Sequence, residues 1–417
     1  MKNIEVWAHW YTMKEPHKVG ILTAATTRGK EVFSFEYEDT WPKSVYKFQL
    51  DPKLQLFKGR YHAPPHSENF GVFLDSSPDR FGRVLMLRRE ALLAKEEKRP
   101  IKTLMPSDYL LGVYDQNRMG GLRFKIDNGP FLQVHNKRTT PPWTSLRELE
   151  QASLFLENKG AEDDPKFSDW LKILFAPGSS LGGARPKASV IDPHKNLWIA
   201  KFPSKEDIKD VGAWEAVVHQ LAKNCGINVP EAHAKKLSSK NHTFLSKRFD
   251  RTSDGKRIHF ASAMTLLEHI DGDNATTGAS YLELVNFIIS SGSPGNVKKD
   301  LEELWRRIVF SIAVSNSDDH LRNHGFLLVG EGWVLSPAYD INPNEFADGL
   351  SLNISDDSNA LDYSLAKDVS HYFRLKKTEA EKIIKKIKHE VVKWRDIASK
   401  HGIVRSEQDR MEKAFHV

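Results

Sequence analysis

One stretch of the sequence decides the fold: Asn316-Ser317-Asp318-Asp319-His320-Leu321-Arg322-Asn323-His324-Gly325-Phe326. It directly follows an apolar segment, Trp305 to Val314, whose hydrophobic residues recur with the period of a helix. Two aspartates, two histidines and two asparagines are costly to place beside a buried helix. Their concentration here indicates a functional site rather than a solvated turn.

The spacing within this stretch points to phosphoryl transfer. Asp318 and Asn323 lie five positions apart, as do the aspartate that takes or orients the hydroxyl proton and the magnesium-binding asparagine of protein-kinase catalytic loops. The neighbouring Asp319 is an alternative base. His320 and His324 have the i, i+4 spacing of zinc ligands on a helix, but no glutamate completes a His-Glu-x-x-His pattern. We therefore expect His320 to brace the loop through hydrogen bonds.

Other segments supply the remaining parts of such a site in kinase order. A glycine-rich turn, Gly178 to Lys187, offers backbone N–H groups and basic side chains to phosphates. Lys201, at the end of an apolar strand, is placed to bind phosphates and to pair with Glu215 on the following helix. Asp340 follows a predicted β-hairpin 22 residues beyond Asp318, where a kinase holds its metal-binding aspartate.

Composition describes a globular chain of 417 residues, with 40% hydrophobic and 28% charged residues. The net charge of +6 is small for this length, so it suits an anionic ligand such as ATP but supports direct nucleic-acid binding only weakly. A single cysteine, Cys225, excludes an intramolecular disulfide and a cysteine-based metal cluster. The first residues lack the apolar segment of a signal peptide, and no stretch of about 18 apolar residues occurs. We expect a cytoplasmic protein with no membrane partner.

The hydrophobic pattern predicts an α+β protein with a two-lobed, protein-kinase-like fold. Short alternating strands open the chain, and a helical period dominates beyond about residue 262. The predicted divisions are an N-terminal β-rich subdomain with helices (1–140), a region like a kinase N-lobe with the glycine-rich turn and the ATP lysine (141–260), and an α-helical catalytic C-lobe (261–417).

As an ordered set, these segments resemble the HipA family of bacterial serine/threonine kinases, the toxins of toxin–antitoxin modules. The resemblance runs over nearly the whole chain and rests on these segments: Asp75 to Arg83, Leu110 to Phe124, Ser180 to Lys187, Arg248 to Arg251, Ser317 to Asn323, and Tyr339-Asp340. The sequence departs from the family pattern at Asp319, where glycine is common, and at Ser77 and Arg80, which replace the usual leucine and glycine.

The resemblance implies a role for each matching residue. Asp318 would be the catalytic aspartate, Asn323 and Asp340 would hold Mg²⁺, and Lys201 would bind the α- and β-phosphates of ATP. The other residues expected at the ATP site are Ser180, Gly182, Gly183, Lys187, Glu215, Lys247 and Phe249.

The resemblance also implies regulation and partners. Ser180, or Ser179 beside it, would be autophosphorylated, which adds negative charge where ATP phosphates bind and switches the enzyme off. Family members typically phosphorylate an aminoacyl-tRNA synthetase, with glutamyl-tRNA synthetase the best-known target, and so arrest growth and cause persistence. They are held by a HipB-type helix-turn-helix antitoxin, so operator DNA would be contacted only through that antitoxin complex.

Three other functions stay open at this point: a small-molecule kinase on the same fold, a catalytically silent co-repressor scaffold, and a nucleic-acid enzyme with a two-metal site. The intact set of Lys201, Asp318, Asn323 and Asp340 counts against a scaffold, which needs none of them. A small-molecule kinase or a nucleic-acid enzyme would not explain the loop around Ser180.

Overall fold

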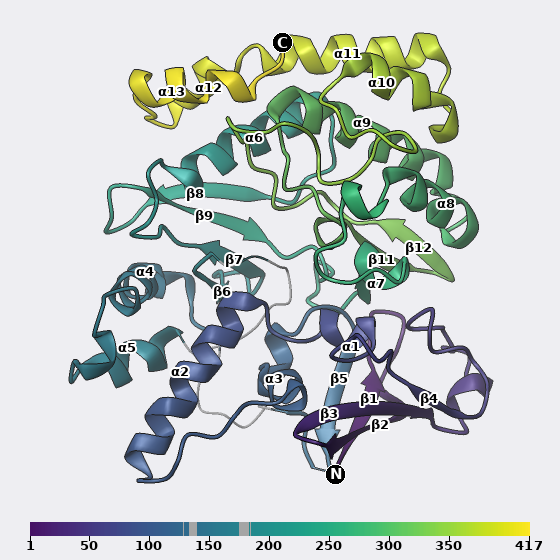
Figure 1. Ribbon diagram of the computed structural model, residues 1–417, viewed down its shortest axis with the longest axis vertical. Coiled ribbons are helices and arrows are strands. Elements are labelled where there is room, and N and C mark those ends of the chain that lie inside the picture. The colour runs from purple at the N-terminus through teal and green to yellow at the C-terminus, as the bar shows by residue number, and fades with distance from the viewer. Residues whose placement is uncertain (128, 133–139, 175–182, 184) are drawn as a thin grey trace. The chain divides into compact units, whose positions relative to one another are not determined.

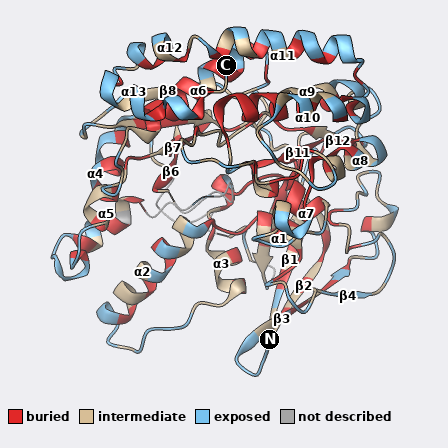
Figure 2. Cartoon of the chain, turned by 45° about the horizontal axis from the view of Figure 1, so that its top comes forward, coloured by how far each residue is buried: buried red, intermediate tan, exposed pale blue. Residues whose placement is uncertain are grey.

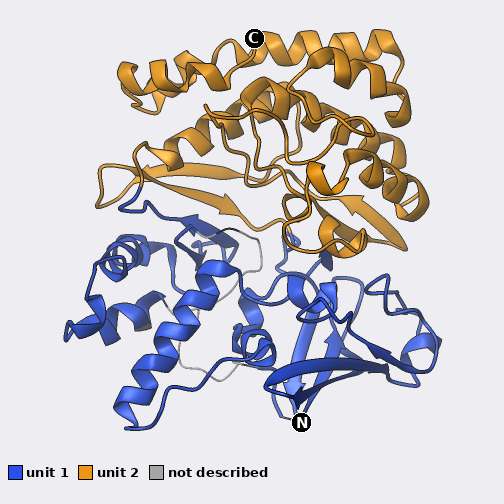
Figure 3. Cartoon of the chain, in the orientation of Figure 1, with its two compact units in different colours: residues 1–206, 250–261 blue, residues 207–249, 262–417 orange. Residues whose placement is uncertain are grey.

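The computed structural model describes residues 1–127, 129–132, 140–174, 183 and 185–417. These residues form two compact units (Figure 3): unit 1 comprises residues 1–206 and 250–261, and unit 2 comprises residues 207–249 and 262–417. The chain therefore crosses from one unit to the other three times. The expected boundary near residue 260 lies at the last crossing, and the expected boundary near residue 140 lies inside unit 1.

Unit 1 begins with a five-stranded sheet whose strand order is β4-β3-β2-β1-β5 (Figure 1). Ile4 and Val6 of β1, like Phe33 and Phe35 of β3, are almost completely buried, whereas the residues between them are partly exposed. This alternation confirms the period-two pattern that predicts strands here. The strands are β1 (Lys2–Ala8), β2 (His17–Thr27), β3 (Lys30–Tyr37), β4 (Arg60–His62) and β5 (Leu122–Ile126).

The rest of unit 1 consists of helices and one hairpin. Helix α2 (Arg80–Glu96) begins at Asp79, whose side chain accepts a hydrogen bond from the backbone N–H of Gly82 and so caps the helix. Its start agrees with the predicted helix from Asp79. The other elements are α1 (Gly71–Asp75), α3 (Pro106–Gly112), α4 (Leu146–Leu156), α5 (Phe167–Leu174), and the antiparallel strands β6 (Lys187–Ile191) and β7 (Leu197–Lys201).

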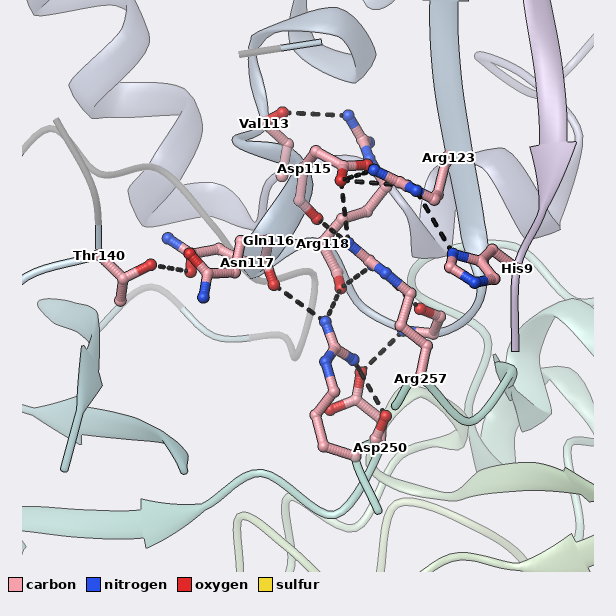
Figure 4. A network of polar contacts seen from close by, with 12 residues as sticks. His9, Val113, Asp115, Gln116, Asn117, Arg118, Arg123, Thr140, Asp250 and Arg257 are labelled. Atoms are coloured by element: carbon pink, nitrogen blue, oxygen red, sulfur yellow. Dashed lines mark hydrogen bonds and ion pairs between the residues drawn. The ribbon is translucent and has the colours of Figure 1, made fainter. Parts of the chain in front are cut away.

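Residues 250–261 are held in unit 1 by a network of charged side chains, which we call the arginine network (Figure 4). Its members are Asp115, Arg118, Arg123, Asp250, Arg251 and Arg257. Asp250 accepts a hydrogen bond from the backbone N–H of Gly120 at 2.8 Å, and Arg251 donates to the carbonyls of Gln116 and Arg118 at 2.9 and 3.0 Å. The motif Arg248 to Arg251, which carries part of the family resemblance, thus contributes two residues to the fold of unit 1.

Asp115 is the acidic centre of the arginine network. Its carboxylate lies 2.7 Å from Arg123 and 3.2 Å from Arg257. Burial alone would raise the pKa of Asp115, but Arg257 and Arg123 lower it below its ordinary value. Burial in turn lowers the pKa of Arg118 and of Arg257 to about 10, so both stay charged at neutral pH.

Unit 2 is built around helix α9 (Val297–Val314), which is buried along most of its length (Figure 2). It packs against α6 (Val211–Cys225), α8 (Tyr281–Ser291), α10 (Tyr363–Asp368) and α11 (Lys377–Val391). Helices on several sides explain why the last seven residues of α9, Ile308 to Val314, are all apolar except Ser311. Cys225, at the end of α6, is buried as expected for a core thiol.

The remaining elements of unit 2 include the predicted hairpin. Strands β11 (Gly325–Val329) and β12 (Gly332–Leu335) pair antiparallel, with Phe326 opposite Leu335. The other elements are the paired strands β8 (Ala232–Lys236) and β9 (His242–Lys247), and α7 (Ala263–Leu266), α12 (Trp394–Lys400) and α13 (Arg405–Met411), while β10 (Phe260–Ser262) spans the last crossing between units. Within the described residues, none of the helices combines the length and hydrophobicity that crossing a bilayer requires.

Candidate active site

The site lies in the loop between α9 and β11, which we call the 315–324 loop. Helix α9 ends at Ser315, which adopts a left-handed backbone conformation with φ of 51°. Non-glycine residues rarely adopt this conformation, and it turns the chain abruptly out of the helix. A short 3₁₀ turn, Leu321–Asn323, then leads into β11. The loop is thus held at both ends by buried elements of unit 2.

Asp318 presents its carboxylate to solvent. Its side chain is 82% exposed, and its carboxylate accepts no hydrogen bond from the described residues. The nearest ion-pair contact joins its Oδ1 to Nε2 of His320 at 3.9 Å. The protein that surrounds it and the negative charge of Asp340 raise the pKa of Asp318, although His320 opposes them and solvent screens part of the effect. Asp318 is therefore available to a reacting group.

Asp319, the next residue, is in the opposite environment. It is buried, its Oδ2 accepts a hydrogen bond of 2.6 Å from the phenol of Tyr281, and its Oδ1 lies 3.0 Å from Nε2 of His324. Burial alone would raise the pKa of Asp319, but His324 and Tyr281 lower it below its ordinary value. Oδ2 of Asp319 thus accepts a hydrogen bond, and Oδ1 lies against the ring of His324, so neither oxygen is open to solvent.

Asn323 provides a buried oxygen without a partner. Its side-chain N–H donates to the backbone carbonyl of Asp318 at 2.7 Å, while its Oδ1 is buried and accepts no hydrogen bond within the described residues. Buried carbonyl oxygens are usually satisfied, so an unsatisfied one next to Asp318 is a candidate metal ligand.

Asp340 lies close enough to Asp318 for its charge to raise the pKa of Asp318. It has a φ of 56°, and such strained conformations of non-glycine residues cluster at functional sites. The segment after it is tied to the 315–324 loop: the N–H of Asn342 donates to Oδ1 of Asn316 at 3.0 Å, and Nδ2 of Asn344 donates to Oγ of Ser317 at 2.8 Å. These hydrogen bonds bring together residues far apart in the sequence.

A small pocket adjoins the loop within unit 2. Its polar lining includes Ser311 and Asn316 from the end of α9, together with Asp319, Asn323 and His324 from the loop. The pocket is therefore lined by buried loop residues, and the exposed Asp318 is not part of its lining.

The structure places the other predicted residues as follows. Lys187 is buried, with its ammonium 2.7 Å from Asp79 in unit 1. Lys201 ends β7 in unit 1, and Glu215 is buried in α6 of unit 2, so their pairing stays a prediction. Gly183 has a φ of 88°, and Ser179, Ser180 and Gly182 lie outside the described residues.

The predicted adenine contacts belong to unit 2. Lys247 ends β9, and the ring of Phe249 packs against the ring of Tyr339 at a tilt of 31°, with a centroid distance of 5.4 Å. Tyr339 also donates its phenolic hydrogen to the carbonyl of Arg322 at 2.8 Å. Phe249 is therefore connected to the 315–324 loop through one aromatic side chain, which favours its placement near the site.

The sequence predicts that His320 braces the loop through hydrogen bonds, but its side chain makes none among the described residues. Its Nδ1 is buried and has no hydrogen-bond partner among the described residues, and its Nε2 makes only the 3.9 Å contact with Asp318. The loop is braced by the side chains of Asn323 and Asp319 instead.

Sequence reasoning missed Tyr281 and the bracing role of Asp319. Ser280 and Glu283 form a capping box that starts α8, and the pattern Ser-x-x-Glu was visible in the sequence. It would have placed Tyr281 in the first turn of a helix. Nothing in the sequence shows that its hydroxyl reaches Asp319, 38 positions away.

A comparison with known families decides which family this is. Residues 179–395 match the profile of the HipA-like C-terminal domain, which is more than half of the chain. The chain belongs to the HipA family. The match contains the 315–324 loop, Tyr281 and Asp340, but not Asp79, the partner of Lys187.

Curated relatives of this HipA-family chain carry names that refer to kinases. A protein of Haemophilus influenzae named "Putative kinase" is 29% identical over 207 residues, covering 44% of this chain and 59% of that protein. A protein of Sinorhizobium fredii named "Putative kinase Y4dM" is 26% identical over 203 residues, covering 45% and 47%. The alignments thus span about half the length of these relatives.

The HipA fold extends over the whole chain. The HipA toxin in a Shewanella oneidensis complex with HipB and its operator DNA superposes with a TM-score of 0.64, at 15% identity, over 99% of this chain and 94% of that one. The superposition confirms the predicted α+β, HipA-like fold, including the N-terminal part that the family profile does not reach.

Proposed function

We propose that this HipA-family protein transfers the γ-phosphate of ATP to a serine or threonine hydroxyl of a protein substrate. The observation that carries the proposal is the contrast within the 315–324 loop. Asp318 is exposed and accepts no hydrogen bond from the described residues, the neighbouring Asn323 has a buried oxygen without a partner there, and the adjacent Asp319 is buried against Tyr281 and His324.

This contrast supports Asp318 as the proposed base. A group that takes a proton from a substrate must be reachable and must have no strong hydrogen bond to lose. Asp318 satisfies both conditions and Asp319 satisfies neither, which favours Asp318 over Asp319 as the base. In the proposed step the substrate hydroxyl oxygen forms the new bond to the γ-phosphorus. The bond from that phosphorus to the β–γ bridging oxygen breaks, ADP leaves, and Asp318 takes the hydroxyl proton.

Two side chains fit a magnesium ion. Oδ1 of Asn323 is a buried oxygen without a partner, and Asp340 supplies a carboxylate near Asp318; both are the hard oxygen ligands that Mg²⁺ prefers. When bound, Mg²⁺ would neutralise charge on the phosphates. Asn323 would also keep the loop in register, because its other side-chain atom donates to the carbonyl of Asp318.

The remaining parts of the proposal rest on the family. The Shewanella oneidensis HipA assembles with HipB and operator DNA, so we propose a HipB-like antitoxin as partner of this chain. Growth arrest as a toxin, an aminoacyl-tRNA synthetase as substrate, and autophosphorylation of Ser179 or Ser180 are proposed on the same basis.

The test is mass spectrometry of the purified protein after incubation with Mg-ATP, with the protein first treated with a phosphatase. Three forms are compared: wild type, Asp318→Ala, and the control Asp396→Ala, which removes an exposed aspartate of α12. We expect one added phosphate on Ser179 or Ser180 in wild type and in Asp396→Ala, and none in Asp318→Ala.

Two outcomes would count against the proposal. Equal phosphorylation of the Asp318→Ala form would remove Asp318 from the chemistry. If the wild-type protein gains no phosphate and transfers none to a synthetase, the alternative function, a catalytically silent co-repressor scaffold bound to its antitoxin, becomes the better description.

A further inference from the structure

We infer that Tyr281, Asp319 and His324 form a positioning unit that fixes the 315–324 loop so that Asp318 and Asn323 face the reaction. The inference rests on the proposed function for the reaction itself, but not for the geometry. Tyr281, Asp319 and His324 are positioning residues, because none of them is exposed enough to touch a substrate.

Asp319 joins the loop to two other elements of unit 2. Tyr281 opens α8 and donates its phenolic hydrogen to Oδ2 of Asp319 at 2.6 Å. Ser311, in the last turn of α9, lies 3.5 Å from the same oxygen. The carboxylate of Asp319 thus contacts side chains of both α8 and α9, and Asp319 is next to Asp318 in the chain.

His324 connects the other end of the loop. Its Nε2 lies 3.0 Å from Oδ1 of Asp319, and its ring meets the ring of Tyr281 edge to face at 5.7 Å. Its backbone carbonyl accepts a hydrogen bond of 2.8 Å from the N–H of Ala263 at the start of α7. His324 follows Asn323 directly and Asp319 follows Asp318 directly, so each of the two residues expected to act in the reaction has a neighbour in the positioning unit.

Burial makes these contacts strong. Tyr281, Asp319 and His324 are 0%, 6% and 2% exposed, and a hydrogen bond to a charged group is stronger when water cannot replace it. Burial and the charge of Asp319 raise the pKa of Tyr281 well above its ordinary value, so the phenol stays a donor.

The test compares Tyr281→Phe with the matched control Tyr37→Phe. Both variants remove one buried phenolic hydroxyl and keep the ring; Tyr37 lies in β3 of unit 1 and donates to the carbonyl of Leu54 at 2.8 Å. We expect Tyr281→Phe to lower kcat for phosphate transfer about tenfold, as the loss of one hydrogen bond to a charged group would, with KM for ATP changed less than about twofold. Tyr37→Phe should leave both kinetic constants unchanged.

A double variant and hydrogen exchange complete the test. Tyr281→Phe combined with Asp319→Asn should be no slower than Asp319→Asn alone, because the phenol then has no charged acceptor left to lose. In the protein without ATP, amide exchange in residues 315–326 should be about tenfold faster in Tyr281→Phe than in wild type or Tyr37→Phe.

The readouts separate the two claims. If amide exchange is faster in Tyr281→Phe but the wild type transfers no phosphate, the positioning unit is supported and the proposed function is refuted. Unchanged exchange in residues 315–326, or a kcat for Tyr281→Phe equal to that of Tyr37→Phe, would overturn the positioning unit even in an active kinase.

Discussion

The arginine network of unit 1 and the 315–324 loop of unit 2 use the same kinds of side chain for different purposes. In the network, Asp115 and Asp250 are buried and each is paired with arginine. In the loop, Asp319 is also buried, against Tyr281 and His324, but Asp318 is left exposed, and the neighbouring Asn323 has an unsatisfied oxygen.

The difference shows what marks an aspartate for chemistry. Residue type, nearby opposite charge and even a perturbed pKa are common to both regions, because structural ion pairs perturb pKa values too. What distinguishes Asp318 is that folding leaves its carboxylate without a hydrogen bond. Each of the following substitutions asks whether a charged residue contributes to the fold or to the reaction.

The largest effect is expected from Asp318→Asn. It should lower the rate of phosphate transfer by about 10²- to 10⁴-fold, the usual contribution of a general base. The thermal midpoint should shift by less than about 2 °C, because an exposed side chain without hydrogen bonds is replaced by one of the same shape. Rate assays beside thermal unfolding check both parts, and a stability loss comparable to that of a core variant would contradict the comparison.

Asp115→Asn should show the converse pattern. Removing this buried charge leaves Arg123 and Arg257 without their carboxylate, so we expect the free energy of unfolding to fall by about 3–5 kcal/mol. Transfer per folded molecule should be retained. Urea unfolding measures the change, with Asp254→Asn, an exposed acid on the same 250–261 segment, as the control that should not alter stability. A stable but inactive Asp115→Asn protein would show that the two regions are not functionally separate.

Lys187→Met tests whether a lysine that the sequence places at the ATP site contributes to stability or to ATP binding. Because its ammonium is buried 2.7 Å from Asp79, we expect a loss of roughly 2–3 kcal/mol in stability. If the lysine binds phosphate instead, KM for ATP should rise while stability stays constant. Denaturant unfolding and the ATP dependence of the rate distinguish the two roles.

The smallest effect concerns pH. His269 lies between Asp273 at 2.8 Å and Glu283 at 3.0 Å. Burial alone would lower the pKa of His269, but hydrogen bonds to Glu283 and Asp273 raise it overall. The stabilisation is therefore fully present below the unfolded pKa of about 6.5 and is lost as pH rises through the raised value. Replacing the residue in His269→Gln should remove about 0.5–1 kcal/mol of stability at pH 5.5 and almost none at pH 8.5, measured by urea unfolding.

Local patterns predicted much of the fold. The alternation of Phe33 and Phe35 marked a strand, and the apolar run before Ser315 marked the buried helix α9. The strand and the helix could each be predicted from residues close together in the sequence, because side-chain direction repeats every two positions in a strand and about every 3.6 in a helix. The hairpin between Asp318 and Asp340 was predicted for the same reason.

Contacts between distant residues could not be predicted in this way. Spacing identified Asp318 and Asn323, yet it could not separate Asp318 from Asp319, because the decision depends on Tyr281 and on the burial of Asp319. The left-handed conformation of Asp340 was equally invisible, since aspartate adopts it only where tertiary contacts require it.

The three crossings of the chain have a practical consequence for anyone who wishes to divide the protein. A fragment that ends at residue 206 would lose the 250–261 segment. It would then lack Arg257, which pairs with Asp115, and Asp250, which accepts the hydrogen bond from the N–H of Gly120. The segment recognised by the family profile, 179–395, begins inside unit 1 and ends inside α12. What is inherited as a recognisable block is therefore not a block that can be expressed, exchanged between relatives or proteolytically released as an independently stable piece.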